Sequence, residues 1–403
     1  MNTFHRSLFT FLLLLVLLAS LLTPRAAIST PPPPTAHPPN APAIVINEVL
    51  THADPPNVDA VELRNLGETP VDLSGWWLTD DDARPQSDWV RLPEGALIPG
   101  YGLYVVANEV GDWPFGLSEA GDSIYLFRPD PVSRAPLQVE EMRFGASPRN
   151  VSFIRYVDAV NIVRFPFQEG APTIGFTNCG VRISSVQIEE LMVDPGSGGS
   201  EYVVIANVGE VEAPLHHTQH PALPWKIVGQ KSNGKDSEMF IFPQAVALAP
   251  GERIIVSEVA PDLFRQMHNI PAIVRIFGPL ESGLSNTGER VALATPLDPE
   301  IDGSVNFAFV DEVAYSNLPP WPAVANNGLA LVRIDPTHYA NDVANWRAAP
   351  ALQTITSRNI ALRGEEHTAT ASQSIASVGE SSGALAANYL YYLPAVQAYR
   401  CPF

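Results

Sequence analysis

Three histidines in the second half of the chain come nearest, in type and spacing, to a chemical motif. His216, His217 and His220 form the pattern H-H-x-x-H, and three imidazoles at this separation could ligate a transition metal. The zinc motif H-E-x-x-H places its two histidines four residues apart on a helix and adds a glutamate base. Here Pro214 and Pro221 bracket the run and it contains no glutamate, so we favour a solvated loop over a metal site.

A run of three aspartates is the second candidate for binding a cation. Asp80, Asp81 and Asp82 follow an apolar stretch, and an acidic loop between strands can supply the oxygen ligands that Ca²⁺ prefers. The spacing of an EF-hand loop is absent, and a similar stretch later in the chain offers only Asp236 and Glu238. We therefore favour a charged turn, with Ca²⁺ as the one cofactor left open.

Motifs for nucleophilic catalysis or nucleotide binding are absent from the sequence. There is no G-x-S-x-G, neither cysteine has a histidine close in sequence, and the glycines follow no Walker or dinucleotide pattern. Glu48 and Glu62, like the adjacent Glu189 and Glu190, could be read as carboxylate pairs, but they lie in expected strands. A backbone-bonding or surface role is the better interpretation, and we expect no enzymatic activity.

Two adjacent tryptophans are the candidate binding surface. Trp76 and Trp77, with Trp89 and Trp113 nearby in sequence, could form an aromatic face for a carbohydrate or a peptide. Adjacent residues of a strand point to opposite faces of the sheet. We therefore expect one of the pair in the core and the other on the surface.

Composition limits which class of protein the sequence can encode. The chain has 403 residues, of which 46% are hydrophobic, 17% are charged and 39 are proline. This length and apolar content predict two domains with packed cores. The formal net charge of −19 repels phosphate backbones, so we expect no nucleic-acid partner.

The N-terminal residues predict an exported protein. Arg6 and the apolar run from Leu8 to Leu22 are typical of a signal peptide, which we place at residues 1–27, followed by a Pro-rich linker at 28–42. The membrane is a partner only if this segment stays uncleaved. In an oxidising compartment Cys179 and Cys401 could form a disulfide, or could remain two surface thiols.

Short apolar runs separated by turn residues continue from residue 44 to about residue 350. They predict antiparallel β-sandwiches, with one short helix in the stretch from Ala260 to Ile273. The stretch from Val61 to Asp80 predicts a β-hairpin with its turn at Asn65 and Gly67, which could take positive φ.

The chain also contains an internal repeat. Residues 46–49, 59–68, 98–100 and 116–122 are similar to 188–192, 201–210, 249–251 and 283–289. The second copy has insertions at 215–223 and 260–273, and Trp225 is its counterpart of the tryptophan pair. We expect two similar domains, at 43–180 and 181–352.

Ordered motifs in both copies resemble one known family. The first copy has INEV at 46–49, ELRNLG at 62–67, LSGWWLTD at 73–80 and PTIGFTN at 172–178; the second has DEVAY at 311–315, PWP at 320–322 and NDVANW at 341–346. Together they resemble the lamin tail domain, which implies two tandem immunoglobulin-like β-sandwiches in an all-β protein. Bacterial members of the family commonly accompany secreted hydrolases or surface proteins.

The last fifty residues divide into two parts. Residues 353–388 are rich in Ser, Thr, Ala and Gly and read as a linker, and an aromatic run from Tyr389 to Val396 follows. That run could add a strand to an exposed sheet edge, could be a docking tag, or could pack as a terminal strand on the second domain. We favour the last of these.

These features predict a non-enzymatic binding or scaffold protein at the cell surface or outside the cell. The resemblance implies an interaction module, and its partner would be a protein or a cell-surface polymer. The alternative is a cation-dependent enzyme, or a calcium-binding accessory module of a secreted hydrolase system, that uses Asp80–Asp82 or the histidine run.

Overall fold

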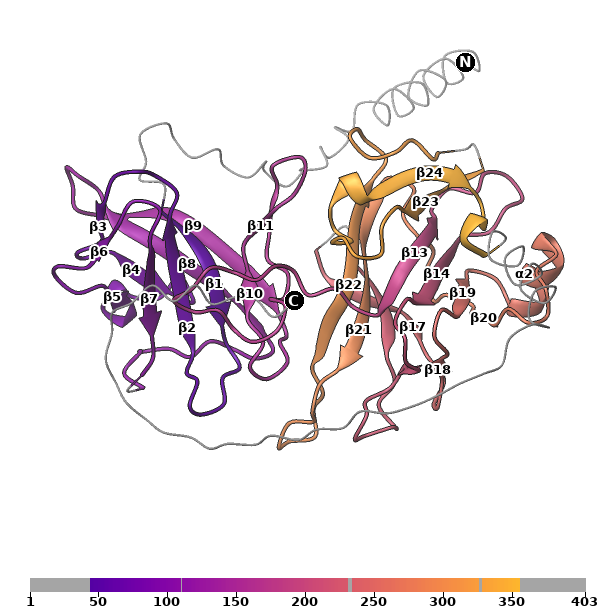
Figure 1. The fold of residues 1–403 in the computed structure, drawn as a ribbon, viewed down its shortest axis with the longest axis horizontal. Helices are drawn as coiled ribbons and strands as arrows, with labels where there is room; N and C mark the ends of the chain where they lie inside the picture. Colours follow the sequence, from indigo (N-terminus) through magenta and orange to yellow (C-terminus); the bar gives the residue numbers. More distant parts are fainter. Residues whose placement is uncertain (1–43, 110, 231–233, 326–327, 356–403) are drawn as a thin grey trace, which may run out of the picture. The chain divides into compact units, whose positions relative to one another are not determined.

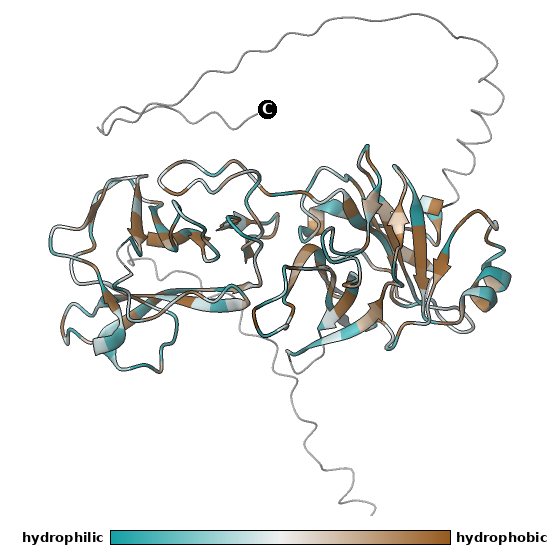
Figure 2. Cartoon of the chain, turned by 90° about the horizontal axis from the view of Figure 1, so that it is seen from below, coloured by the Kyte–Doolittle hydropathy of each residue, from teal (hydrophilic) through white to brown (hydrophobic). Residues whose placement is uncertain are grey.

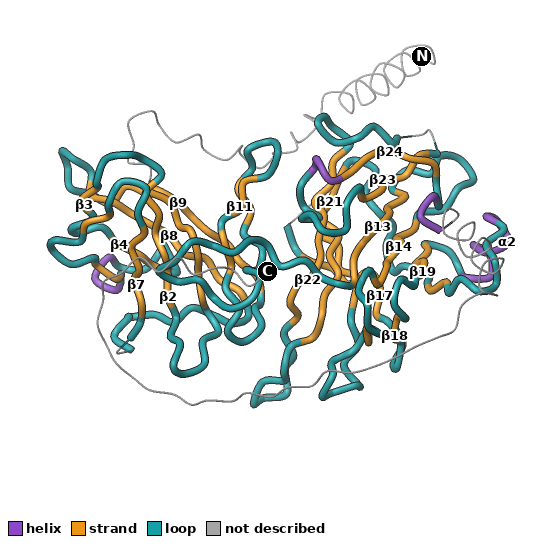
Figure 3. Tube along the Cα trace, in the orientation of Figure 1, coloured by secondary structure: helices purple, strands orange, loops and turns teal. Residues whose placement is uncertain are grey.

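A computed structural model describes residues 44–355, apart from residue 110, residues 231–233 and residues 326–327 (Figure 1). The predicted signal peptide and linker, the aromatic run at 389–396 and Cys401 lie outside the described residues. Strands and loops make up almost all of the described chain (Figure 3). None of its helices has the length and apolar character to cross a bilayer.

The first domain consists of two four-stranded antiparallel sheets. Their strand orders are β10-β1-β2-β7 and β5-β4-β8-β9, and two-stranded ladders join β3 to β6 and β11 to β12. The elements are β1 (Ile44–Leu50), β2 (Ala60–Asn65), β3 (Val71–Asp72), β4 (Trp77–Thr79), the 3₁₀ helix η1 (Gln86–Asp88), β5 (Val90–Arg91), β6 (Leu97–Ile98), β7 (Leu103–Ala107), β8 (Gly121–Pro129), β9 (Pro136–Gly145), β10 (Phe153–Ile154), β11 (Tyr156–Val157) and β12 (Val163–Arg164).

The second domain repeats this plan with additions. A six-stranded sheet has the order β20-β19-β14-β13-β23-β24, a four-stranded sheet has the order β17-β16-β21-β22, and β15 pairs with β18. The elements are β13 (Val186–Met192), β14 (Tyr202–Asn207), β15 (Ala213–Pro214), β16 (Lys226–Gln230), β17 (Asp236–Ile241), β18 (Ala247–Leu248), β19 (Arg253–Ser257), α2 (Pro261–His268), β20 (Ile276–Phe277), β21 (Gly288–Pro296), β22 (Phe307–Ser316), β23 (Leu329–Arg333), the 3₁₀ helix η2 (Val343–Asn345) and β24 (Trp346–Pro350).

Each domain has its own core between its two sheets. In the first domain Ile46 and Leu63 from one sheet meet Leu78 and Ile124 from the other, and all four are fully buried. The second domain has a corresponding core that draws on residues 186–346. Apolar residues lie along the strands in both domains (Figure 2). The predicted all-β, immunoglobulin-like sandwich fold is confirmed.

The predicted hairpin at Val61–Asp80 is wrong. β2 pairs with β1 and β7, whereas β4 pairs with β5 and β8 in the opposite sheet. The turn between them is made by the Asn65 side chain, which accepts a hydrogen bond from the Gly67 N–H at 2.9 Å, and Gly67 does not adopt positive φ. Two apolar runs close in sequence therefore face the same core from different sheets.

The predicted helix in the second-copy insertion is confirmed as α2. It begins after Ala260 with Pro261 in its first turn and ends at His268, and the following Asn269 adopts the left-handed conformation. Phe264 is fully buried, but Leu263 and Met267 are exposed. The helix covers the outer face of the six-stranded sheet, where Phe264 packs among Tyr202, Ile255 and their neighbours.

Candidate functional site

The two adjacent tryptophans lie on opposite sides of β4. Trp76 is 4% exposed and packs in the first core, and Trp77 is half-buried on the outer side of its sheet. One tryptophan of the pair is thus a core residue. The sheet around Trp77 is fully paired, because β4 lies between β5 and β8, so Trp77 offers no open strand edge for a ligand.

The aspartate run forms a self-contained turn. Asp80 makes an ion pair with Arg84 at 3.1 Å, and burial raises the pKa of its carboxyl. Asp81 accepts a hydrogen bond from the Ala83 N–H at 2.9 Å, and Asp82 is exposed. The three carboxylates therefore serve local turn bonds or solvent, and they do not converge on one point.

The histidine run replaces a two-residue turn of the first domain. In that domain the Trp76 N–H donates to the Leu73 carbonyl at 3.0 Å across Ser74 and Gly75. In the second domain the Trp225 N–H donates to the Leu215 carbonyl at 2.9 Å, across residues 216–224. The base of the turn is therefore the same in both domains, and the histidines lie in an enlarged loop at its tip.

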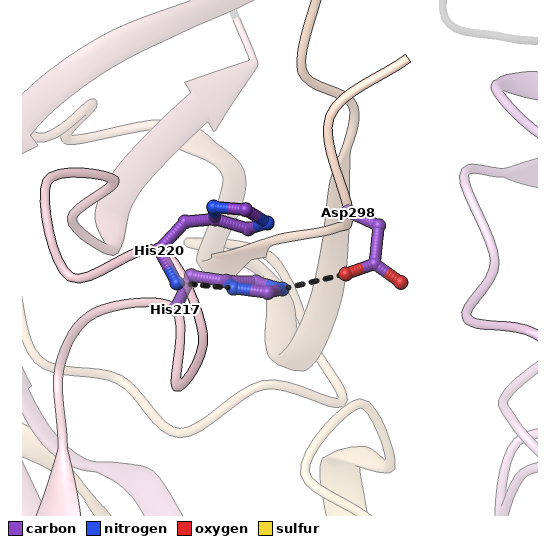
Figure 4. A group of neighbouring side chains, drawn as sticks. All are labelled: His217, His220 and Asp298. Carbon is purple, nitrogen blue, oxygen red and sulfur yellow. Dashed lines mark hydrogen bonds and ion pairs between the residues drawn. The ribbon is translucent and has the colours of Figure 1, made fainter. Parts of the chain in front are cut away.

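Two of the three histidines meet an aspartate from another loop. The ligand atoms of His217, His220 and Asp298 lie within 4.8 Å of one another. Figure 4 shows the three side chains side by side. His216 is not part of this group; its Nδ1 lies 3.2 Å from the carbonyl oxygen of His217. Asp298 follows β21 and was not predicted from the sequence.

The hydrogen bonds of His217 oppose metal binding. Its Nδ1 accepts the backbone N–H groups of Gln219 at 3.2 Å and His220 at 3.0 Å, so the proton of the neutral ring lies on Nε2. That nitrogen is 3.3 Å from Asp298 Oδ1, to which it donates. A metal on Nε2 would force the proton onto Nδ1, against two backbone donors. The rings of His217 and His220 also stack, with centroids 5.0 Å apart.

Buried carboxylates in the first domain bind a backbone segment. Glu48 accepts hydrogen bonds from the Thr173 N–H at 2.7 Å and the Thr173 hydroxyl at 2.6 Å. Glu62, its neighbour on β2, accepts the Gly175 N–H at 2.6 Å and the Asn47 side-chain amide at 2.6 Å. The segment after β12 is thereby fixed across the outer face of the sheet.

Burial perturbs the acidity of both glutamates. Removal from water raises the pKa of Glu48, and it raises the pKa of Glu62 to about 7. All four carboxylate oxygens are occupied by donors of the chain: Ser152 and Thr173 bind Glu48, and Asn47 and Gly175 bind Glu62. The pair therefore holds structure together and lacks a free oxygen for acid or base work on a substrate.

The second domain uses the same device. Glu190 lies at the position of Glu48 in the strand register and accepts the hydroxyl of Thr354 at 2.7 Å. Both first strands also carry a bulge, and there the N–H of Ile46 donates to Glu140 and the N–H of Ile188 donates to Asp311.

An arginine completes each of these acid clamps. Arg155 pairs with Glu140 in the first domain, and Arg333 pairs with Asp311 at 3.0 Å in the second. The register and these matched contacts give a residue-by-residue equivalence between the two domains.

The domains differ at one sheet edge. β7 is the last strand of its sheet, whereas its equivalent β19 is covered by the parallel strand β20. Val105 occupies the position of Ile255, since each lies opposite the residue that pairs with Glu48 or Glu190. Val105 is 37% exposed and Ile255 is fully buried. Among the described residues, none pairs with the outer edge of β7.

A groove lies beside this free edge. It has a volume of about 640 Å³ and runs between β5 and β7; its lining includes Trp89, Val90, Leu92, Tyr104, Val106 and Trp113. In the second domain the equivalents of Val90 and Leu92 are Phe240 and Phe242, because the N–H groups of Leu92 and Phe242 donate to Trp76 and Trp225 respectively.

The aromatic ring of Phe277, on β20, packs against both of these phenylalanines, with centroids 6.3 and 6.0 Å away. The groove of the first domain thus lies where β20 adds an aromatic side chain in the second. The sequence singled out Trp89 and Trp113 as aromatic residues. Its one signal for the edge was indirect: the insertion at 260–273 occurs in the second copy only.

Comparison with known proteins identifies the family of the first domain. Residues 37–139 match the family model of the Lamin Tail Domain, and the predicted family is thereby confirmed for this part of the chain. No curated protein matches the sequence. A crystal structure of a DUF4876 family protein from Bacteroides thetaiotaomicron is 10% identical, with a TM-score of 0.26, and covers 77% of this chain and 92% of its own. At that TM-score the likeness carries no argument.

Proposed function

We propose that this chain, whose first sandwich is a lamin tail domain, is an exported binding or scaffold protein without enzymatic activity, and that it binds an extended segment of a protein partner along β7. One observation carries the proposal: no strand of the described chain pairs with the outer edge of β7, and a groove with aromatic walls lies beside it. A free edge offers backbone donors and acceptors in a row, and an added strand satisfies them.

The second sandwich supports this proposal, because a strand is already added to its equivalent edge, as we propose for a partner strand on β7. There β20 runs parallel to β19, and the Ile255 N–H donates to the Arg275 carbonyl at 3.1 Å. We take this sandwich to be a second lamin-tail-like copy whose own edge is closed. Its role in the proposal is structural, and recognition belongs to the first copy.

A peptide that copies the natural occupant of the closed edge is the sharpest probe. We would label VRIFGPLE, the sequence of residues 274–281, and titrate it into the full-length Cys401→Ser chain while following fluorescence anisotropy. The matched variant adds Val105→Pro. By equivalence with Ile255, the Val105 N–H points away from β2, so proline removes only the outward donor and is tolerated on an edge strand.

We expect saturable binding that weakens at least tenfold with Val105→Pro and is unchanged with Val105→Thr. Circular dichroism of all three chains checks that the sandwiches stay folded. Equal binding to the proline and threonine variants, or no binding to either, would overturn the proposal.

A further inference from the structure

The described residues leave open which segment covers β7. In the second domain the cover belongs to the same chain, since β20 follows α2 directly. It supplies an aromatic residue followed two positions later by proline, in Phe277-Gly278-Pro279-Leu280. The first domain has no corresponding insertion between β7 and β8, because only 13 residues separate Ala107 from Gly121.

The same pattern also occurs near the C-terminus; a further instance, Phe127-Arg128-Pro129, lies in β8, which is already paired on both sides. Tyr392-Leu393-Pro394-Ala395 again places an aromatic residue two positions before a proline, inside the apolar run Tyr389 to Val396. A run of this composition has the β propensity that an added strand needs.

The disulfide of Cys179 points to a covalent tether between this run and the first domain. Cys179 is disulfide-bonded, and the only other cysteine of the chain is Cys401. Cys179 lies four residues after Gly175, whose backbone approaches the Val105 side chain: a Cβ placed on Gly175 would lie 3.9 Å from Val105 Cγ2.

The tether is also long enough. Tyr392 precedes Cys401 by nine residues, and a chain of nine residues spans up to about 30 Å. Cys179 is four residues from Gly175, which contacts β7, so Cys179 lies at most about 14 Å from that contact. The reach of the nine residues exceeds this distance.

From these observations we infer that residues 389–396 of the same chain add to β7 as a strand, with Tyr392 in the groove beside Val90 and Leu92. This inference rests on the proposed function, because it makes the C-terminal segment the resident occupant of the proposed binding edge. A partner strand then binds only in competition with it. The tether raises the local concentration of the segment to the millimolar range typical of short flexible links.

Amide hydrogen exchange on the oxidised full-length chain tests the inference directly. We expect the backbone amides of residues 103–107 to exchange at least tenfold faster in Tyr392→Asp than in wild type. Tyr389→Asp is the matched control, because residues three apart in a strand face opposite ways and Tyr389 would point to solvent. Equal exchange in all three chains would overturn the inference.

The VRIFGPLE peptide separates this inference from the proposed function. If both hold, the oxidised wild type binds the peptide at least tenfold more weakly than Cys401→Ser does. Equal, Val105-dependent binding to both chains leaves the proposed function standing and overturns the inference. Light scattering that shows a dimer dissociated by Tyr392→Asp would assign the segment to a second copy and would overturn its placement within one chain.

Discussion

At the scale of single residues, buried carboxylates determine how each sandwich is closed. A backbone-bonding or surface role was predicted for Glu48 and Glu62. Both are buried and bond backbone, and their partners Thr173 and Gly175 lie more than 110 residues away. No local pattern could identify those partners, because the strand register brings them together. The histidine run, by contrast, was visible in the sequence. The hydrogen bonds of its loop were not visible there, and they decide which nitrogen of His217 carries the proton.

The raised pKa of Glu62 predicts a pH dependence of stability. Its carboxyl has a pKa of about 7 in the folded protein and 4.5 as its ordinary value, so the folded state binds more protons between those limits. The contribution to the free energy of unfolding is full below about pH 4.5 and is lost as pH rises through about 7. For a shift of this size it is about 3 kcal/mol.

Urea unfolding between pH 4.5 and 8 measures this contribution. Glu62→Gln should be less stable overall, since an amide cannot accept from both Asn47 and Gly175, but its stability should fall less over this window. The control Glu68→Gln removes the same charge from an exposed turn and should keep the wild-type slope. An unchanged slope in Glu62→Gln would show that another group is responsible.

At the scale of elements, the two domains show which parts of the fold are interchangeable. Strand positions, the Asn65 turn and the α2 insertion could be read from the sequence, because periodicity and turn chemistry are local. The pairing of β2 and β4 could not, since neighbouring apolar runs look alike whether they share a sheet or face each other across a core. The sequence also could not predict that β7 is an edge strand of the described chain, because an edge strand is recognised only by the absence of a pairing strand beside it.

Exchange of one turn tests whether the histidine loop has a role of its own. Replacing residues 216–224 with Ser-Gly, the turn of the first domain, keeps the Leu215 and Trp225 bond at the base. We expect the free energy of unfolding to change by less than about 1 kcal/mol, because closing a loop seven residues shorter changes the entropy little. Trp225→Ala, which removes packing from the core, should cost about 3 kcal/mol.

Zinc binding is the second measurement, made on wild type and on the Ser-Gly exchange. Wild type and the Ser-Gly exchange should respond alike to ZnCl₂ in thermal unfolding, since His217 is committed to backbone donors. A melting temperature that rises with zinc only in wild type would restore the metal-binding reading of the loop.

At the scale of the whole molecule, charge is the dominant feature. A net charge of −19 on 403 residues destabilises the compact state through self-repulsion, and salt screens it. From the same composition we predicted that nucleic acid is not a partner and that the chain has two domains. Composition carries no information about the partner, because the recognition that we propose depends on one sheet edge and its groove.

Screening and specific calcium binding can be told apart by thermal unfolding. Raising NaCl from about 0.05 to 0.5 M should increase the melting temperature by a few degrees. CaCl₂ and MgCl₂ at matched ionic strength should have similar effects, because the Asp80–Asp82 carboxylates do not converge. A larger calcium effect that Asp81→Asn/Asp82→Asn removes would instead support a cation-dependent protein.

The position of β1 in its sheet has a kinetic consequence. β1 is the first described strand of the chain, yet it pairs with β10 and its Ile46 N–H donates to Glu140. Glu48 on β1 binds Thr173, which follows it by 125 residues. At synthesis rates of about 5–20 residues per second, roughly 6–25 s separate these two residues. The first sandwich cannot close during that interval, because its contacts are long-range and such folds form slowly. A translocation machinery that accepts only unfolded chains would therefore find the N-terminal domain still open when its last segment leaves the ribosome.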